Sequence, residues 1–317
     1  MKKLLLVIAL VSFFAAAGTS HAYPTQPITI ISPFAAGGGT DAVARIIATL
    51  MQNELGVPVN VVNRDGGGGV VGHTAIAQAT PDGYTIGIGT VEMAMLHWMG
   101  HTTLTHEDML PIGGLNIDSA AITVPADRWE DYASLIEYVR ANEGVLNASG
   151  TTVGGIWHLA MAAWLSAEGL ASDHIHWIPS AGAAPAQQEM LAGNIDIITV
   201  SLPEVAALVD AGRLTVIAYM GDERNPTRPD VPTLKELGVP VNAATWRGLF
   251  GPRGMPENVV QVLEETLETI VASQEFIDFM NSRGFNIAFY PSEEWAEFVR
   301  QSDEQFGVVM REAGLVQ

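Results

Sequence analysis

The sequence predicts an α/β protein made of two doubly wound lobes around a central cleft. At roughly 150 residues per domain, its 317 residues suggest about two domains. From residue 28 onward, short β-branched runs alternate with helical patterns, which indicates parallel sheets with helices on their faces. The pattern divides near residues 120 and 240, so we expect lobe 1 at residues 23–120 plus 242–317 and lobe 2 at residues 121–241.

The composition is that of a folded and strongly acidic protein. Hydrophobic residues make up 48% of the chain and charged residues 16%, which is typical of globular proteins. Lys and Arg number 15 against 35 Asp and Glu, so the net charge of −20 disfavours nucleic-acid and anionic-lipid partners, both of which need clustered basic residues. The absence of cysteine excludes disulfides, thiolate metal sites and cysteine nucleophiles.

Residues 1–22 have the pattern of an export signal. Two lysines precede an apolar run from Leu4 to about Ala17, and Ser20 with Ala22 forms a small-x-small cleavage site. The apolar run is shorter than the roughly 20 residues that a membrane span needs. We expect cleavage before Tyr23; losing the two lysines would change the charge from −20 to −22. Because the chain has no cysteine to carry an N-terminal lipid, we expect a location in the periplasm.

Lobe 1 is expected to begin with a strand, a glycine-rich loop and a helix. The β-branched run Ile28–Ser32 predicts the strand, and apolar positions with i, i+3, i+4, i+7 spacing predict the helix. Thr40 or Asp41 can cap this helix, and Gly56 ends it. The next expected elements are a strand at 57–62, a turn at 66–69, a helix at 71–79 and a strand at 84–89.

The alternation continues through lobe 2. The expected strands are residues 121–124, 145–148, 174–178, 195–200 and 214–218. The expected helices are residues 132–142, 154–169, 185–192 and 203–211. A segment rich in proline and charge at 224–232 then breaks the pattern, and two helices at 257–273 and 292–312 close the chain.

Three loops that follow strands and open helices predict an anion-binding cleft. They span residues 35–41, 148–155 and 180–185, and they are rich in glycine, alanine and hydroxyl side chains. Backbone N–H groups and the positive end of a helix dipole gather at such loops. One such loop could be an ordinary tight turn, but three in one chain favour a binding site. The residues expected to contact a ligand are Ala35, Ala36, Gly37, Gly38, Thr40, Asp41, Thr90, Glu92, Ser149, Gly150, Thr151, Thr152, His158, Ser180, Ala181 and Ser201.

Glu92 is the most unusual single residue of this set. It follows directly after the predicted strand that ends with Gly89 and Thr90. Its carboxylate could accept a donor group of a ligand, or it could cap the next helix. The sequence favours neither role over the other.

Four further side chains near the loops have two possible roles. They could reach a ligand, or they could hold loops and fill the core, as such residues more often do. They are Arg64, Trp157, Trp246 and Arg247.

Enzymatic interpretations have weaker support in the sequence. Residues 37–42 fit a relaxed G-x-G-x-x-A pattern and Asp65 ends the next strand, as in a dinucleotide-dependent oxidoreductase. The export signal disfavours a dinucleotide-dependent oxidoreductase, and residues 33–36 make the turn longer than that pattern allows. A secreted hydrolase would need a nucleophile and a base that the loops do not supply, and no G-x-S-x-G elbow occurs. His106 lacks the second histidine of a zincin helix, and His174 and His176 lack a third ligand, so we expect no metal and no cofactor.

The ordered motifs resemble the receptor family of tripartite tricarboxylate transporters, the TctC or Bug-type solute-binding proteins. The resemblance covers nearly the whole chain after the export signal. It rests on residues 23–28, 33–41 (PFAAGGGTD), 63–68 (NRDGGG), 81–85 (PDGYT), 182–186 (GAAPA), 211–214 (AGRL), 229–233 (PDVPT) and 246–250 (WRGLF).

This resemblance implies a type II periplasmic binding fold that closes on a small carboxylate, such as a di- or tricarboxylate, without catalysis. It implies delivery of that ligand to the permease subunits of a tripartite tricarboxylate-type transporter, and we expect a monomer. A receptor of this shape could instead report to a sensory partner. In such receptors backbone amides and ordered water hold the carboxylate between two loops, which correspond here to residues 35–40 and 149–152. We expect one helix N-terminus from each lobe to converge on that carboxylate.

The chain departs from the family pattern at two places. Asp65 stands where the family often has proline, and the small residues Ser180 and Ala181 stand where an aromatic or basic residue is common. The far half of the binding site is therefore expected to differ, so the resemblance leaves the identity of the carboxylate open.

Overall fold

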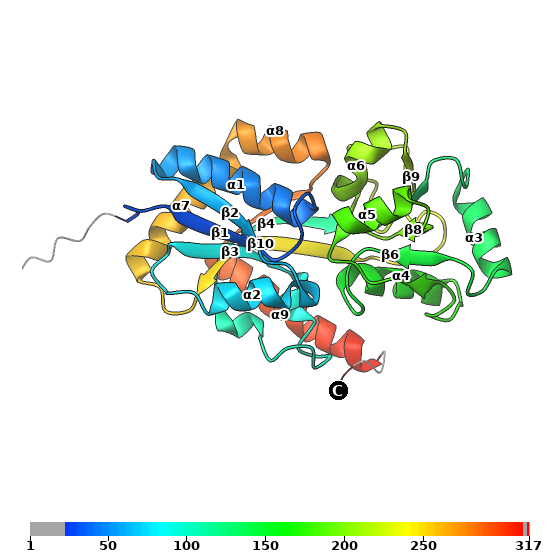
Figure 1. Cartoon of the computed structure of the whole chain (residues 1–317), viewed down its shortest axis with the longest axis horizontal. Coiled ribbons are helices and arrows are strands. Elements are labelled where there is room, and N and C mark those ends of the chain that lie inside the picture. Colours follow the sequence, from blue (N-terminus) through cyan, green and yellow to red (C-terminus); the bar gives the residue numbers. More distant parts are fainter. Residues whose placement is uncertain (1–22, 313–315, 317) are drawn as a thin grey trace, which may run out of the picture.

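Two sheets joined by crossing strands form the framework of the protein (Figure 1). The computed structural model describes residues 23–312 and residue 316. The predicted export signal at residues 1–22 and its cleavage site lie outside the described residues. Among the helices that are described, none is both long and apolar enough to span a membrane.

The six-stranded sheet belongs to what we term lobe 1. Its strand order is β11-β4-β10-β3-β1-β2. Strands β1, β2 and β3 are parallel, whereas β10 runs antiparallel to β3 and β4, so the all-parallel sheet expected from the sequence is wrong in this half. The strands are β1 Ile28–Ser32, β2 Val59–Asn63, β3 Thr85–Thr90, β4 Met109–Ser119, β10 Ala244–Pro252 and β11 Ile287–Pro291.

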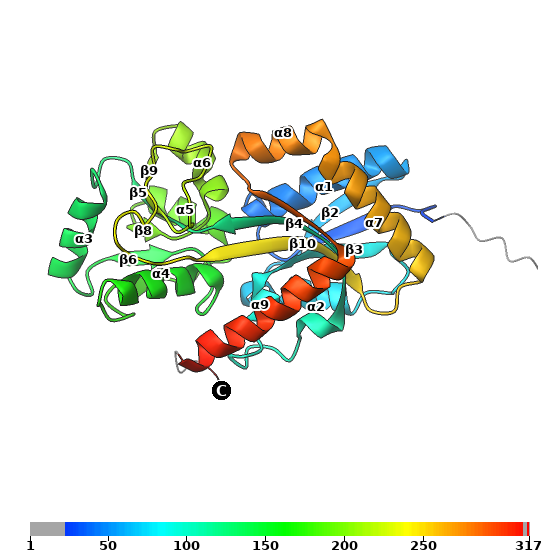
Figure 2. The same ribbon diagram turned by 180° about the vertical axis from the view of Figure 1, so that it is seen from behind.

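Helices cover both faces of this sheet (Figures 1 and 2). Ile28 and Ile30 of β1 pack with α1, α7 and α8 on one face. Ile31 points to the other face, where Ile76 of α2 and Trp295 of α9 are buried. The elements are α1 Gly39–Leu55, α2 Val70–Ala77, α7 Glu257–Ala272, α8 Gln274–Arg283 and α9 Ser292–Glu312, with short 3-10 turns η1 Gly67–Gly69, η2 Val91–Ala94 and η3 His106–Asp108.

The five-stranded sheet belongs to lobe 2. Its order is β7-β6-β8-β5-β9, with β6 parallel to β7 and β8, and β5 antiparallel to β8 and β9, so the expected parallel sheet is wrong in this lobe as well. The Trp164 indole N–H donates to the Tyr132 hydroxyl at 2.8 Å and joins α4 to α3. The elements are β5 Ala121–Pro125, α3 Tyr132–Ala141, β6 Asn147–Ser149, α4 Ile156–Ala167, β7 His176–Trp177, α5 Ala183–Leu191, β8 Ile197–Ile198, α6 Leu202–Asp210 and β9 Leu214–Tyr219.

The chain crosses between the lobes where three backbone hydrogen bonds hold the connecting segments together. β4 continues through Ala120 into β5, and the return from β9 to β10 includes Met220 and Ala243. The Ala120 N–H donates to the Ala243 carbonyl at 2.7 Å, and the Met220 N–H donates to the Ala120 carbonyl at 2.8 Å. The Ala243 N–H donates in turn to the Met220 carbonyl at 3.1 Å. The connection between the lobes is therefore narrow, with Ala120, Met220 and Ala243 bonded to one another.

Several elements differ from the sequence prediction. Strands β4, β10 and β11 and helix α8 were not predicted, because β4 and β10 contain glycines and prolines that mask their strand character. Helix α1 begins at Gly39 with Gly38 as its N-cap and has no side-chain cap, so the expected capping by Thr40 or Asp41 is wrong. Gly56 ends α1 in the left-handed conformation, as predicted.

Candidate ligand-binding site

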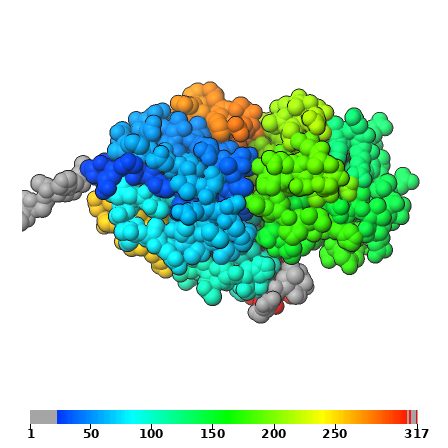
Figure 3. All heavy atoms as spheres, in the orientation of Figure 1, coloured from blue at the N-terminus to red at the C-terminus, as the bar shows by residue number. Residues whose placement is uncertain are grey.

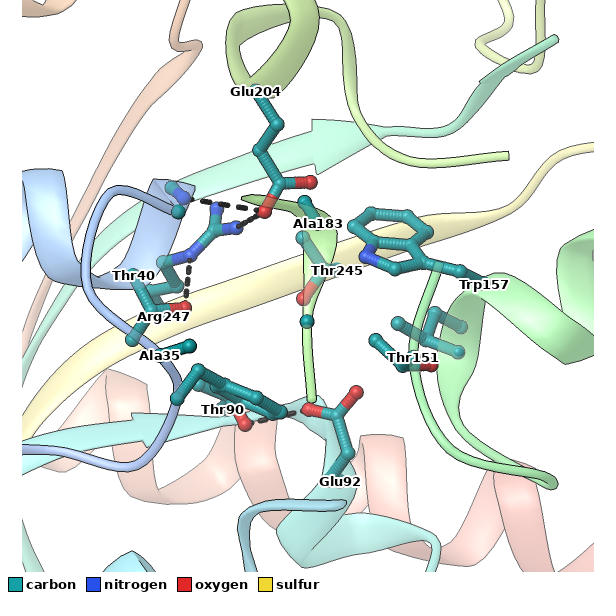
Figure 4. A pocket seen from close by; sticks show the side chains of 15 residues that line it. Ala35, Thr40, Thr90, Glu92, Thr151, Trp157, Ala183, Glu204, Thr245 and Arg247 are labelled. Atoms are coloured by element: carbon teal, nitrogen blue, oxygen red, sulfur yellow. Dashed lines mark hydrogen bonds and ion pairs between the residues drawn. The ribbon is translucent and has the colours of Figure 1, made fainter. Parts of the chain in front are cut away.

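A small cavity lies between the two lobes, at the carboxyl ends of β1, β3 and β6 (Figure 4). The lobes meet closely along this seam (Figure 3). The cavity volume is about 20 Å³, room for about one water molecule, so a larger ligand requires the lobes to move apart. The lining residues are Phe34, Ala35, Gly38, Gly39, Thr40, Thr90, Glu92, Thr245 and Arg247 of lobe 1 and Thr151, Ile156, Trp157, Gly182, Ala183 and Glu204 of lobe 2.

The N-terminus of α1 is met by a carboxylate from the opposite lobe. The N–H of Gly39, the first residue of α1, donates to Glu204 Oε1 at 3.3 Å. Asp41, which could have capped this helix, instead accepts from the Gly37 N–H at 2.9 Å and pairs with Arg45. Glu204 therefore satisfies a helix end that is otherwise left without a side-chain partner.

Glu204 performs two capping functions at once. It is the third residue of α6, where its Oε2 accepts from the Ser201 N–H at 3.0 Å and the Ser201 hydroxyl at 2.9 Å in a capping box. Its other oxygen reaches Gly39 and the Arg247 Nη2, the latter at 3.4 Å. One carboxylate thus links α6 of lobe 2 to α1 and β10 of lobe 1.

Arg247 is the central cation of the cleft. It projects from β10 and is 2% exposed. Its Nε donates to the Thr40 hydroxyl at 3.1 Å, and its Nη1 contacts Asp118 Oδ2 at 2.8 Å. Burial raises the pKa of Asp118 to about 6, although Arg247 acts in the opposite direction, so Asp118 is ionised at neutral pH. Arg247 is therefore already paired with two carboxylates of the protein itself.

Glu92 lies on the other side of the cavity from this ion-pair cluster (Figure 4). It is part of η2 and is 3% exposed, and the Thr90 hydroxyl donates to its Oε2 at 2.6 Å. Burial raises the pKa of Glu92, while the Thr90 hydroxyl, the Ile156 backbone and the distant charge of Arg247 lower it. Ile156 begins α4, so a carboxyl of lobe 1 also approaches a helix N-terminus of lobe 2.

The buried residue His73 lies next to Thr90, whose hydroxyl donates to Glu92. His73 Nε2 lies 3.3 Å from the Thr90 hydroxyl oxygen. Burial lowers the pKa of His73 to about 3, so its ring is neutral at physiological pH. Because the single Thr90 proton is donated to Glu92, we infer that His73 Nε2 carries a proton and donates it to Thr90.

Thr151 lines the cavity and has a buried hydroxyl with no hydrogen bond. It is 3% exposed, lines the cavity, and its Oγ1 is buried without a partner among the residues that the structure describes. A buried hydroxyl without a partner costs free energy, and such groups in native proteins call for an explanation such as a bound ligand or water.

Six of the predicted ligand-contacting residues line this cavity, and ten do not. The residues that line it are Ala35, Gly38, Thr40, Thr90, Glu92 and Thr151. The residues that the structure places outside its lining are Ala36, Gly37, Asp41, Ser149, Gly150, Thr152, His158, Ser180, Ala181 and Ser201.

Local hydrogen bonds explain several of these placements. The Ser149 hydroxyl donates to the Ile178 carbonyl at 2.7 Å, and the Ser180 hydroxyl donates to the Gly182 carbonyl at 2.8 Å. His158 Nδ1, in the first turn of α4, accepts from the Gly154 N–H of the preceding loop at 3.0 Å. Thr152, Ser180 and Ala181 line a separate surface hollow together with residues 66–69.

Glu204 is the main residue that sequence reasoning missed. Its contact with Gly39 joins positions 165 residues apart, so no local pattern could reveal it. The pattern Ser201-x-x-Glu204 indicates only a capping box, which it also forms. Trp157 and Arg247 line the cavity, whereas Trp246 donates to the Ser302 hydroxyl at 2.9 Å in lobe 1 and Arg64 is exposed.

The histidines that suggested metal chemistry contact other protein groups or are exposed. His174 precedes β7, and its Nε2 lies 2.8 Å from the Val139 carbonyl, whereas His176 is exposed. His97 and His106 both contact Asp303 of α9, at 3.3 and 3.1 Å. Within the described part of the chain, no group of three or more His, Asp or Glu residues could hold a metal ion.

Two α/β lobes that close over a buried polar cavity define the class of periplasmic solute-binding proteins. Within that class, the family model described as the tripartite tricarboxylate transporter family receptor, TctC, matches residues 43–315. The chain belongs to this family.

Solved structures support the same assignment. The periplasmic binding protein BugD is 29% identical, with a TM-score of 0.87 over 93% of this chain and 99% of its own. MatC from Rhodopseudomonas palustris with bound malate is 25% identical, with a TM-score of 0.82 over 90% and 99%. Rpa4515 from R. palustris with adipate is 25% identical, with a TM-score of 0.87 over 93% and 99%. The predicted family and the two-lobed type II fold are thereby confirmed.

Proposed function

We propose that the protein captures a small organic carboxylate in the cavity between its lobes and delivers it to the membrane subunits of a tripartite tricarboxylate-type transporter. The Thr151 hydroxyl without a partner carries this proposal, because Thr151 lines a polar cavity that both lobes enclose. The malate and adipate bound to MatC and Rpa4515 support a carboxylate as the ligand class.

The proposal includes several features of the mature protein. It acts as a monomer in the periplasm after cleavage near Ala22 and Tyr23, and it binds without catalysis. Its lobes comprise residues 23–120 plus 242–317 and residues 121–241, with the hinge at the backbone links of Ala120. Ligand contacts are assigned to the six predicted residues that line the cavity, together with Trp157 and the N-terminus of α5 at Ala183.

Calorimetry with a panel of small acids tests this function. The panel comprises di- and tricarboxylates, aromatic acids and amino acids, with neutral sugars as controls. We expect one ligand per chain, from among the acids. Binding of neutral sugars alone, or of metal cations alone, would contradict the proposal.

A single substitution tests whether Thr151 contacts the ligand. Thr151→Val keeps the shape but removes the hydroxyl, and the loss of one hydrogen bond costs about 0.5–1.5 kcal/mol, or about twofold to twelvefold in affinity. The exposed Thr49→Val on α1 serves as the matched control. Equal affinities of both variants and the wild-type protein would remove Thr151 from the site.

A further inference from the structure

The loop at residues 150–155 forms part of the wall that lobe 2 contributes to the cavity. Thr151 belongs to this loop, and Ile156 and Trp157 follow it directly at the start of α4. Gly155 is the N-cap of that helix and has no side chain that could cap it. The shape of the cavity therefore depends on the contacts that hold the loop in place.

Hydrogen bonds within lobe 2 hold this loop at both of its ends. At the first end, the Thr151 carbonyl accepts from the Trp177 indole N–H at 3.3 Å and from the Ser180 backbone N–H at 3.0 Å. At the second end, the Gly154 N–H donates to His158 Nδ1 at 3.0 Å. The His158 ring also packs on Trp177, with the ring centroids 4.9 Å apart. His158 is therefore in contact with an anchor of each end.

The hydrogen bond from Gly154 can form only while the His158 ring is neutral. A backbone N–H can only donate, so Nδ1 accepts through its lone pair and the single ring proton is on Nε2. Protonation of the ring places a second hydrogen on Nδ1. Two donors would then face each other, and this end of the loop would lose its hydrogen bond.

The surroundings of His158 favour its neutral form. Its ring is half-buried, and burial lowers its pKa below the usual value of 6.5. Among the described residues, no charged side chain contributes to this lowering. The titratable side chains on the neighbouring elements are exposed or make other contacts; they are Glu168 after α4, His176 of β7, and Glu92, His97 and His101 of lobe 1, where Met99 packs against Gly154.

We infer that His158 is a positioning residue of the binding site: its neutral ring holds the loop at residues 150–155 in the arrangement that binds ligand, and protonation of the ring releases the loop. His158 does not itself line the cavity, so it acts through Gly154 and Thr151. The consequence for affinity rests on the proposed function, whereas the hold on the loop does not. Below pH 6.5 the ring gains a proton as the pH falls through its lowered pKa, so affinity should fall in the same direction.

Hydrogen exchange tests the hold on the loop without any ligand. NMR measures how much the exchange of the Gly154 amide is slowed relative to an unfolded chain, from pH about 7 to about 4.5, in the mature wild-type protein and in His158→Asn. Asparagine keeps an acceptor atom near the place of Nδ1 but does not titrate. We expect the protection of this amide to fall at least twofold with pH in the wild type and to stay constant in His158→Asn. The exposed His176→Asn is the matched control and should behave as the wild type.

Calorimetry over the same pH range tests the consequence for binding. The probes are malate and adipate or, where neither binds, the acid of the panel that binds most tightly. The ratio of the dissociation constants of wild type and His158→Asn should rise at least twofold as the pH falls, because titration of the probe and of Asp118 affects both proteins alike. His158→Leu has no acceptor and should bind at least twofold more weakly than His158→Asn at neutral pH.

The outcomes separate this inference from the proposed function. The same pH dependence of Gly154 protection in wild type and His158→Asn would overturn the inference. A constant ratio of dissociation constants, or equal affinities of His158→Leu and wild type, would also overturn it, with urea unfolding to show that each variant folds. Binding of no acid of the panel would overturn the proposed function, and hydrogen exchange would still decide whether His158 holds the loop.

Discussion

At the scale of single residues, the site is built from the protein's own carboxylates. Glu204 occupies the N-terminus of α1, and Glu92 approaches the N-terminus of α4. We expected these helix ends to be open to a ligand carboxylate. Each lobe instead supplies an acid to a helix end of the other lobe, which stabilises the closed arrangement and makes the cavity more selective.

The lowered pKa of the single residue His73 makes the folding stability depend on pH. Its pKa is lowered to about 3 in the folded protein, whereas an exposed histidine titrates near 6.5. Below pH 6.5 the unfolded chain therefore binds a proton that the folded protein does not, and the wild-type protein loses stability as the pH falls from about 6.5 toward 3.

The variant His73→Gln should lack this part of the pH dependence. The difference in unfolding free energy between wild type and variant should change by up to about 1.4 kcal/mol per pH unit, in favour of the wild type as the pH rises. Urea unfolding at a series of pH values from 4.5 to 6.5 measures it, a range within the span between the lowered and ordinary pKa values of histidine. The exposed His101→Gln is the control. Parallel curves for wild type and His73→Gln would contradict the assignment of a neutral buried ring.

At the scale of elements, the start of α1 decides how closely the lobes approach. A Cβ at Gly39 would lie 2.8 Å from Glu204 Cγ and 2.9 Å from Arg247 Nη2. A side chain on the first residue of α1 would therefore force Glu204 and Arg247 to shift from their places in the closed arrangement.

Gly39→Ala should therefore hinder closure without unfolding either lobe. The backbone of Gly39 is helical, so alanine is tolerated locally, but its methyl group pushes against lobe 2. We expect ligand affinity to fall at least tenfold and the radius of gyration in X-ray scattering to stay larger at saturating ligand. The exposed Asn53→Ala on the same helix is the control. Equal affinity and equal compaction of the two variants would show that this contact does not limit closure.

The sequence predicted most elements of the fold but only part of the site. Periodic patterns found α1 and most helices of lobe 2, because those patterns are local. The crossing strand β10 was missed because Gly248, Gly251 and Pro252 interrupt it, although it carries Arg247. The glycine-rich loops predicted which strand ends line the cavity. The contact of Glu204 with Gly39 across the lobes depends on tertiary packing, which no local pattern encodes.

At the scale of the whole molecule, the proposed function requires an acidic protein to attract an acid. The chain carries a net charge of −20, yet exposed charges more than about 8 Å apart are largely screened at physiological salt. Local groups inside the cleft therefore decide binding. Under the proposed function, the lobes separate at the links of Ala120, Met220 and Ala243, and a ligand that contacts both lobes favours the closed state.

A crystal structure of the mature protein with the acid that binds most tightly in calorimetry tests this mechanism most directly. We predict density for that acid between the lobes, in contact with the Thr151 hydroxyl from one side and with residues near Thr40 from the other. Density on an outer surface, or contacts with a single lobe, would contradict capture of the ligand by closure of the two lobes.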